Sequence, residues 1–195
     1  MKICVFCSSS NAVANVYVNE AISLAKLIGQ NGQTLINGGA NVGLMHTMLE
    51  KALEAGAHTI GIIPEKLKGH NLVSEHAREL HITKDMMERK AIMREQADAF
   101  VALPGGFGTL EEILEVITLK QLDYHNKAIV FLNTNGFYDD LFRQFERSFE
   151  ENFAKHNYRE LYHIAQTSEE VMDYLSSYTP STPVNKWYKV PGNRE

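Results

Sequence analysis

The fold of this chain is decided by one stretch, Ala99-Phe100-Val101-Ala102-Leu103-Pro104-Gly105-Gly106-Phe107-Gly108-Thr109-Leu110-Glu111-Glu112. Its first five residues are apolar and predict a short buried strand, which the proline ends. After the glycines, apolar residues recur at helical spacing, at Leu110, Ile113, Leu114 and Ile117. A glycine-rich turn from a strand into a helix leaves backbone N–H groups uncovered at the positive end of the helix dipole. The stretch therefore predicts a cradle for a phosphate group.

The same stretch contains two carboxylates, Glu111 and Glu112, which a phosphate alone would repel. We therefore interpret the phosphate as a binding handle and expect the carboxylates to act on another part of the same molecule. A structural alternative fits the spacing equally well. Thr109 and Glu112 match a capping box, in which both side chains bond free N–H groups at a helix start. Spacing alone leaves both interpretations open.

Strand-like and helical patterns alternate along the rest of the chain. Apolar strand-like runs lie at Lys2–Ser8, Thr34–Asn37, Thr59–Ile63, Phe100–Leu103 and Ala128–Leu132, with a weaker one near His163–Ala165. Helical patterns lie at about Tyr17–Gln30, Leu44–Ala55, Met86–Ala97, Leu110–Leu122, Tyr138–Asn152 and Glu169–Ser176. Continuous apolar strands separated by helices predict a Rossmann-like, doubly wound parallel sheet with helices on both faces. We expect a single α/β domain over residues 1–178, followed by an extended tail over residues 179–195 that packs through its aromatic residues and has a disordered tip.

Three glycine- or serine-rich turns follow predicted strands: Ser8-Ser9-Ser10-Asn11, Gly38-Gly39-Ala40-Asn41-Val42-Gly43-Leu44, and the turn at Gly105–Thr109. Because ligands of such sheets bind beyond the carboxyl ends of the strands, we expect the three turns to converge on one crevice for a nucleotide-like ligand. The second turn has neither the spacing of the dinucleotide fingerprint nor the Gly-Lys-Ser/Thr of a Walker loop. Dinucleotide redox chemistry and ATP hydrolysis are therefore disfavoured.

The composition of the chain limits which partners and cofactors we expect. The net charge is −5 and hydrophobic residues make up 44% of the chain, as in ordinary globular proteins. No basic cluster exceeds Arg89-Lys90 and no apolar run reaches membrane-spanning length, so we expect a cytoplasmic protein that binds neither nucleic acid nor membrane. Cys4 and Cys7 are interpreted as small core residues. The eight histidines include no H-x-x-x-H pair, so we predict no metal site and no cofactor.

The segment Asp85-Met86-Met87-Glu88-Arg89-Lys90 is the second candidate constellation. One interpretation is a solvated helix face with i,i+4 pairs such as Asp85–Arg89. The other is that Arg89 or Lys90 supplies positive charge to the crevice, where an arginine suits fork-like bonding to phosphate or carboxylate. Helical periodicity does not separate the two.

These motifs together resemble a known family. Pro104–Glu112 is similar to the PGGxGTxxE motif of the LOG ("lonely guy") phosphoribohydrolases, and Met86–Lys90 to their upstream M-H-x-R-K element. Gly38–Met45 resembles their GGxxxGLM turn, and the resemblance extends to about Tyr178. Met87 stands where the family usually has histidine, and His46 where a glycine is typical. The segment around Asn71 and Glu75 does not clearly supply the family's acidic residue near the substrate.

Members of that family hydrolyse the N-glycosidic bond of adenosine-type 5′-monophosphates, so the resemblance implies AMP or a cytokinin riboside 5′-monophosphate as substrate and a homodimeric assembly. It makes Arg89 and Glu112 the catalytic pair. The substrate-binding residues implied by position are Ser8, Gly38, Gly39, Lys90, Gly105, Gly106, Phe107, Gly108, Thr109, Leu110, Glu111 and Thr118. The three departures leave the preferred base open, including whether a bulky N6-prenyl group fits.

Two other classes of function stay open. One is a non-catalytic binder or carrier of a nucleotide or of the molybdenum cofactor, because the same fold and glycine turns occur in molybdenum-cofactor carriers. The presence of both Arg89 and Glu112 favours the enzyme. The other is the lysine decarboxylase label that many LOG proteins once had, which is disfavoured because nothing around Lys90 suggests a pyridoxal site.

Overall fold

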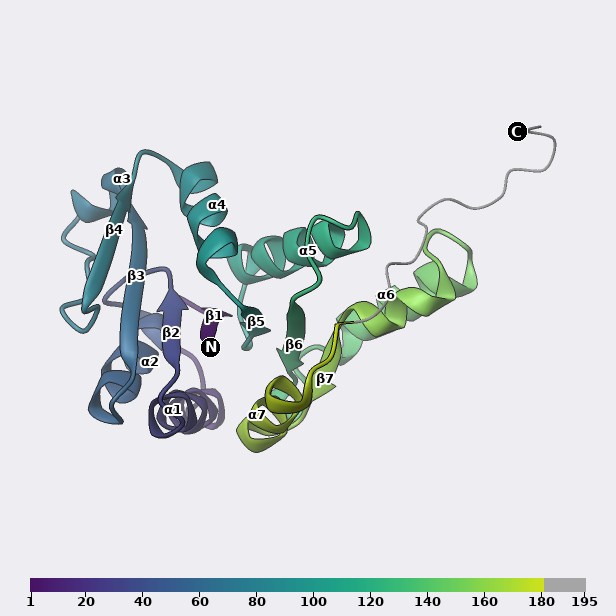
Figure 1. Cartoon of the computed structure of the whole chain (residues 1–195), viewed down its shortest axis with the longest axis horizontal. Helices are drawn as coiled ribbons and strands as arrows, with labels where there is room; N and C mark the ends of the chain where they lie inside the picture. Colours follow the sequence, from purple (N-terminus) through teal and green to yellow (C-terminus); the bar gives the residue numbers. More distant parts are fainter. Residues whose placement is uncertain (181–195) are drawn as a thin grey trace.

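The computed structural model, described here for residues 1–180, contains one seven-stranded sheet in which each pair of neighbouring strands is parallel (Figure 1). The strands are β1 (Lys2–Phe6), β2 (Thr34–Asn37), β3 (His58–Pro64), β4 (Glu79–Thr83), β5 (Ala99–Ala102), β6 (Ala128–Leu132) and β7 (His163–Ala165). Their order is β4-β3-β2-β1-β5-β6-β7. The chain therefore winds outward from β1 in one direction, and then from β5 in the other.

Helices cover both faces of this sheet (Figure 1). One face is covered by α1 (Asn15–Gln30), α2 (Gly43–Glu54) and α7 (Ser168–Ser177), and the other by α4 (Met86–Gln96), α5 (Phe107–Gln121) and α6 (Asp139–Glu150). A short α3 (Glu65–Lys68) and the 3-10 helices η1 (Thr134–Gly136) and η2 (His156–Leu161) complete the elements. The predicted doubly wound α/β fold is confirmed. No helix of residues 1–180 is long and apolar enough to cross a membrane.

Side chains of alternate residues on each strand enter two separate cores. On β1, Ile3 and Val5 pack against the side of α1 and α2, whereas Cys4 and Phe6 pack toward α4 and α5. This alternation follows from the two-residue period of a strand. Because both faces of the sheet are buried, residues on both faces of such a strand are apolar, and the sequence shows a continuous apolar run. Cys4 and Cys7 are free and buried, as predicted for core residues, and burial raises the pKa of the Cys4 thiol.

The strand order creates a switch point between β1 and β5. The two strands are neighbours, with Phe6 in register with Ala102, but the helices that follow them lie on opposite faces of the sheet. The turns after β1, β2 and β5 consequently open at the same edge of the sheet, which is where ligands of such folds bind.

Three sequence-based expectations need correction or fall outside the described residues. β4 was not predicted, because its segment Glu79–Thr83 is polar and mostly exposed at the edge of the sheet. The helix predicted to begin at Leu110 begins at Phe107 instead. The expected tail over residues 179–195 lies almost wholly outside the described residues, which end at residue 180.

Candidate active site

The centre of the candidate site is an ion pair between two helices on the same face of the sheet. Nη2 of Arg89, from α4, donates to Oε1 of Glu112, from α5, at 3.1 Å. Arg89 is 8% exposed and Glu112 is 7% exposed. Charged side chains are rarely this buried, and they remain so only when paired. The structure thus brings the two predicted catalytic residues together, although they are 23 residues apart in sequence.

The turn after β2 leaves space for the guanidinium. A Cβ built on Gly38 would lie 2.4 Å from Nη2 of Arg89 and 2.8 Å from the sulfur of Met45. A side chain at this position would therefore have to displace the ends of Arg89 and Met45. Nε of Arg89 is buried and has no hydrogen-bond partner among the described residues, so the guanidinium keeps donor capacity beyond its bond to Glu112.

The N-terminus of α5 has the features of an anion site. Its N-cap is Gly106, which offers no side-chain cap, and no acidic residue occupies the first turn. The first N–H groups of the helix have no intrahelical partner, and their dipole favours negative charge. A Cβ on Gly106 or Gly108 would meet no atom within 4 Å, so this end of the helix is open. A Cβ on Gly105 would instead lie 2.1 Å from the hydroxyl oxygen of the buried Thr109.

The capping-box interpretation of Thr109 and Glu112 is wrong. Because α5 begins at Phe107, Thr109 is already the third helical residue and Glu112 the sixth, so neither occupies the position that a capping box requires. The carboxylate of Glu112 reaches Arg89 instead of the helix start.

The turns after β1 and β2 are joined to each other. The N–H of Gly43 donates to Oδ1 of Asn11 at 2.7 Å, and the N–H of Leu44 donates to the carbonyl of Ser8 at 2.9 Å. A Cβ on Gly43, which has a φ of 57°, would lie 2.4 Å from the backbone of Ser9. The first N–H groups of α2 are thus used inside the protein, whereas those of α5 are uncapped by any side chain.

A second layer of ion pairs flanks the buried one. Lys90 contacts Glu111 and lies 3.5 Å from Oε2 of Glu115, to which Arg94 donates at 2.8 Å. The predicted alternative of an Asp85–Arg89 pair is wrong: Asp85 caps α4 by accepting from the N–H of Glu88 at 2.8 Å. Arg89 and Lys90 both contact glutamates of α5.

Tyr138 supports the turn after β5, and sequence reasoning missed it. Its buried hydroxyl donates to the carbonyl of Leu103 at 2.6 Å, directly before the Pro104-Gly105 turn. Its own N–H donates to Oδ1 of Asn133 at 2.7 Å. A single tyrosine 35 residues away gives no sequence signal for this role, because only the fold brings α6 to β5.

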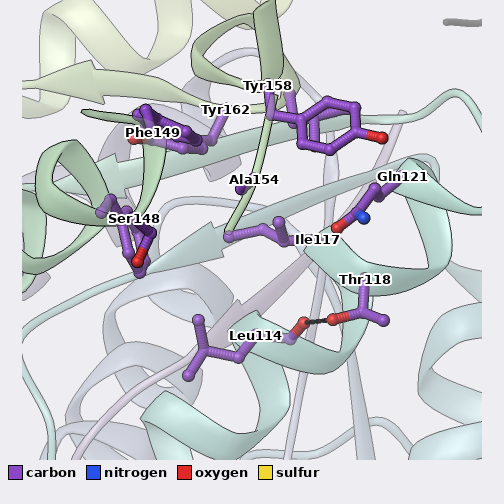
Figure 2. Close-up of a pocket in the computed structure, with 11 residues that line it drawn as sticks. Leu114, Ile117, Thr118, Gln121, Ser148, Phe149, Ala154, Tyr158 and Tyr162 are labelled. Atoms are coloured by element: carbon purple, nitrogen blue, oxygen red, sulfur yellow. Dashed lines mark hydrogen bonds between the residues drawn. The ribbon is translucent and has the colours of Figure 1, made fainter. Parts of the chain in front are cut away.

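Thr118 lies in a different place from the ion pair. It comes six residues after Glu112, about 9 Å further along the helix and on another side of it. Its hydroxyl donates to the carbonyl of Leu114 at 2.8 Å. Figure 2 shows it lining a pocket of about 200 Å³ that α5 forms with the segment from α6 to Tyr162. Phe107, another predicted binding residue, is 93% exposed at the start of α5.

Burial and charge act in opposite directions on Glu112. Loss of water raises the pKa of its carboxyl group above the ordinary value, and the nearby Glu111 carboxylate adds to the rise, while the Arg89 guanidinium opposes it. The net direction is upward. A carboxylate with a raised pKa beside a fixed cation is a common feature of active sites.

Fold and geometry together define a class: an α/β protein with an open anion site at a helix N-terminus and a buried glutamate–arginine pair next to it. A family model described as "Possible lysine decarboxylase" matches residues 45–175. A "Probable cytokinin riboside 5′-monophosphate phosphoribohydrolase" of Oryza sativa subsp. japonica is 41% identical over 179 residues, which cover 92% of this chain and 85% of that protein. A cytokinin riboside 5′-monophosphate phosphoribohydrolase of Arabidopsis thaliana is 40% identical over 179 residues, covering 92% and 83%. The chain belongs to this LOG family.

Solved structures share the fold. The molybdenum cofactor binding protein from the phototrophic bacterium Rippkaea orientalis superposes with a TM-score of 0.71 at 25% identity, covering 90% of this chain and 95% of that one. The molybdenum cofactor carrier protein of Chlamydomonas reinhardtii gives a TM-score of 0.69 at 24% identity, with 90% and 95% covered.

The raised pKa of Glu112 gives the first prediction. A carbon-detected NMR titration should place the pKa of its carboxyl group above about 4.3, the value of a free glutamate. The folded state then binds this proton more tightly than the unfolded chain does. The contribution of Glu112 to stability should therefore be full below the unfolded pKa and lost as pH rises through the folded pKa.

Replacing Arg89 tests whether its positive charge lowers the pKa of Glu112. In Arg89→Met the pKa of Glu112 should rise further, because the group that lowers it most is gone. A Glu112 pKa at or below that of a free glutamate in the parent protein would contradict this account of the site.

Proposed function

We propose that this protein hydrolyses the N-glycosidic bond of AMP and of N6-modified adenosine 5′-monophosphates, releasing the free base and ribose 5-phosphate. The observation that supports this most directly is the buried Arg89–Glu112 pair beside the uncapped N-terminus of α5. The relatives named as cytokinin riboside 5′-monophosphate phosphoribohydrolases support the same reaction. The N-terminus of α5 would bind the phosphate, and the carboxylate of Glu112 would lie near the sugar, so that the two contact opposite ends of one ribose 5-phosphate group.

The reaction requires a negatively charged group near the sugar, and we assign this role to Glu112. Breaking an N-glycosidic bond gives the sugar oxocarbenium character, so positive charge develops at the anomeric carbon while the leaving base gains electrons. A buried carboxylate stabilises that cation or orients the attacking water, and the low-dielectric surroundings strengthen its effect. Glu112 has this role in our proposal, assisted by Glu111. Positioned groups of this kind contribute on the order of 10²–10⁴-fold.

The remaining residues orient the reactants. Arg89 holds Glu112 in place, and the positive charge of its guanidinium stabilises the phosphate or the leaving base. The N–H groups at Gly106–Thr109 bind the phosphate, whose binding energy aligns the sugar. Gly38, Gly39 and Ser8 would border the crevice from the neighbouring turns, and Leu110 and Glu111 of α5 with Lys90 of α4 would line its other side. Thr118 lines a separate pocket and has no part in this proposal. Hydrolysis by these residues requires no cofactor.

A carrier function is the second candidate. The structural likeness to a molybdenum cofactor binding protein and a molybdenum cofactor carrier protein favours it, because the same fold occurs in proteins named for holding a ligand. Release of free adenine from AMP distinguishes the enzyme from the carrier. Lysine decarboxylase activity is not proposed, since no described feature around Lys90 forms a pyridoxal site and this lysine is paired with Glu111.

The phosphate handle yields a prediction about substrate choice. AMP should give adenine and ribose 5-phosphate, and adenosine should react far more slowly because it has no phosphate to bind at α5. Gly108→Asp places a carboxylate in the open space at this helix end. It should reduce kcat/KM for AMP at least tenfold and leave the slow adenosine reaction nearly unchanged.

The matched control is Gly69→Asp, which adds the same charge at the end of α3, where a Cβ meets only ordinary contacts. Chromatography of free adenine measures all the variants. Equal turnover of AMP and adenosine by the parent protein would refute the phosphate handle.

The role of Glu112 yields the next prediction. Glutamine keeps an oxygen that accepts from Arg89 but has no negative charge for the sugar cation. Glu112→Gln should therefore lower turnover of AMP by roughly a hundredfold or more, while AMP still binds. Glu115→Gln, on the same helix and also facing α4, is the control and should retain activity. If Glu112→Gln turns over AMP within a few-fold of the parent, Glu112 is not catalytic.

We also propose a homodimeric, cytoplasmic protein. From the sequence alone, the apolar-rich helical patterns at Leu44–Ala55 and Leu110–Leu122 are candidates for the contact. In the structure Leu44, Met48 and Leu49 are buried within the monomer, so α2 has little apolar surface left. Exposed apolar side chains lie at the starts of α4 and α5, at Met86, Met87 and Phe107, and further along the α5 segment at Leu114 and Leu122. A dimer formed through the starts of the two helices would cover the site.

Light scattering tests the assembly. The protein should have twice the 22.0 kDa mass of one chain at micromolar concentration, and Met87→Glu should shift it toward the monomer because it places charge in the contact. A monomer at all concentrations would contradict the proposal.

A further inference from the structure

A cluster of three metal-ligating side chains includes neither residue of the candidate active-site pair. His46 and Glu50 are four residues apart on α2, so they lie on one face of the helix. His76 comes from the segment between α3 and β4. One ligand atom from each of the three residues lies within 4.8 Å of the other two. The rings of His46 and His76 are 5.1 Å apart between centroids.

We propose that His46, Glu50 and His76 bind a divalent transition-metal ion, with Zn²⁺ as the representative of the class. Two imidazoles and one carboxylate are a ligand set that Zn²⁺ uses, with water in the fourth position. Bonds of about 2.1 Å in a tetrahedron place ligand atoms about 3.4 Å apart. The three side chains are partly buried, and binding would require them to bring their ligand atoms closer than the 4.8 Å within which they now lie.

The surroundings of the cluster fit a cation. Nδ1 of His46 is buried and has no hydrogen-bond partner among the described residues. Glu75 adds a second carboxylate 4.0 Å from Nε2 of His76. Lys51 opposes a cation, because its ammonium group lies 3.2 Å from Glu50. It also contacts both oxygens of Glu54 at 2.9 Å, so it keeps a partner when Glu50 turns to the metal.

The cluster connects two parts of the chain that meet beside the candidate active site. The segment that contains His76 is bonded to the turn after β2: the N–H of Ser74 donates to Gly39 at 2.9 Å, and the N–H of Asn41 donates to Leu72 at 2.9 Å. A metal ion would tie this segment to α2 as well. Its role is therefore to hold the segment in place, and this role is independent of the proposed nucleotide hydrolysis.

Sequence reasoning predicted no metal site because it looked for paired histidines on one helix. The relevant pattern is a histidine and a glutamate at i,i+4, completed by a histidine 30 residues further on. Only the fold brings His76 to α2.

The test uses the full-length protein, freed of metal by chelation and then titrated with Zn²⁺. Calorimetry should give one Zn²⁺ per chain at micromolar concentration, and saturation should raise the melting temperature by about 5 °C. His46→Ala, Glu50→Gln and His76→Ala should each weaken binding at least tenfold. Hydrogen exchange at the amides of Asn41 and Ser74 should slow when Zn²⁺ is bound.

A matched control is available at a second histidine–glutamate group. Glu79 accepts from His58 at 3.0 Å and from His81 at 2.6 Å, at the edge of the sheet. His58→Ala and Glu79→Gln should leave Zn²⁺ affinity unchanged. The proposal is overturned if the parent protein binds no Zn²⁺ at micromolar concentration, or if the control variants lose as much affinity as the variants of the cluster. Neither result bears on the hydrolysis of AMP.

Discussion

The burial of the Arg89–Glu112 ion pair is the constraint on which the site depends. Two charges removed from water are stable only if their geometry is good and their remaining donors and acceptors are provided for. The fold provides the geometry with a bond of 3.1 Å between α4 and α5 and with the absence of a side chain at Gly38, while Nε of Arg89 is left without a partner among the described residues. The turn after β2, the start of α5 and the packing of α4 must all keep their positions for the pair to form. A structure built around such a pair holds its carboxylate in place before any ligand arrives.

Two helices begin at the same edge of the sheet and use their N-termini differently. At α2, the side chain of Asn11 accepts a hydrogen bond from the N–H of Gly43, and the carbonyl of Ser8 accepts one from the N–H of Leu44. This helix start therefore joins two turns together. At α5, the N-cap is glycine and no side chain caps the helix. Since an unbonded helix start favours an anion, the difference identifies which of the glycine turns is available to a phosphate. Both turns contain glycine in the sequence, so their glycines alone do not distinguish them.

Sequence periodicity was sufficient for the fold wherever strands are buried on both faces, as in β1, β5 and β6. It failed at β4, whose polar residues Glu79 and His81 are typical of an exposed edge. Within the site, the pattern around Gly105–Glu112 correctly marked a strand, a turn and a helix, but it placed the helix start three residues late. That error allowed a capping box at Thr109, which the structure excludes. The partners of Arg89 and the support from Tyr138 depend on contacts between distant segments, which no local pattern encodes.

The turn at Gly38–Asn41 connects the two sites of the molecule. On one side it packs against Arg89, and on the other it is bonded to the segment around Val73 and Ser74. Gly39, with a φ of 68°, lies so close to β3 that an added Cβ would be 3.0 Å from Gly61. The turn is therefore held from three directions and has little freedom to shift. A cation at His46, Glu50 and His76 would add to the stability of this arrangement without displacing Arg89. Because the turn is already fixed by its own contacts, we expect such a cation to change the stability of the protein more than the geometry of the buried pair.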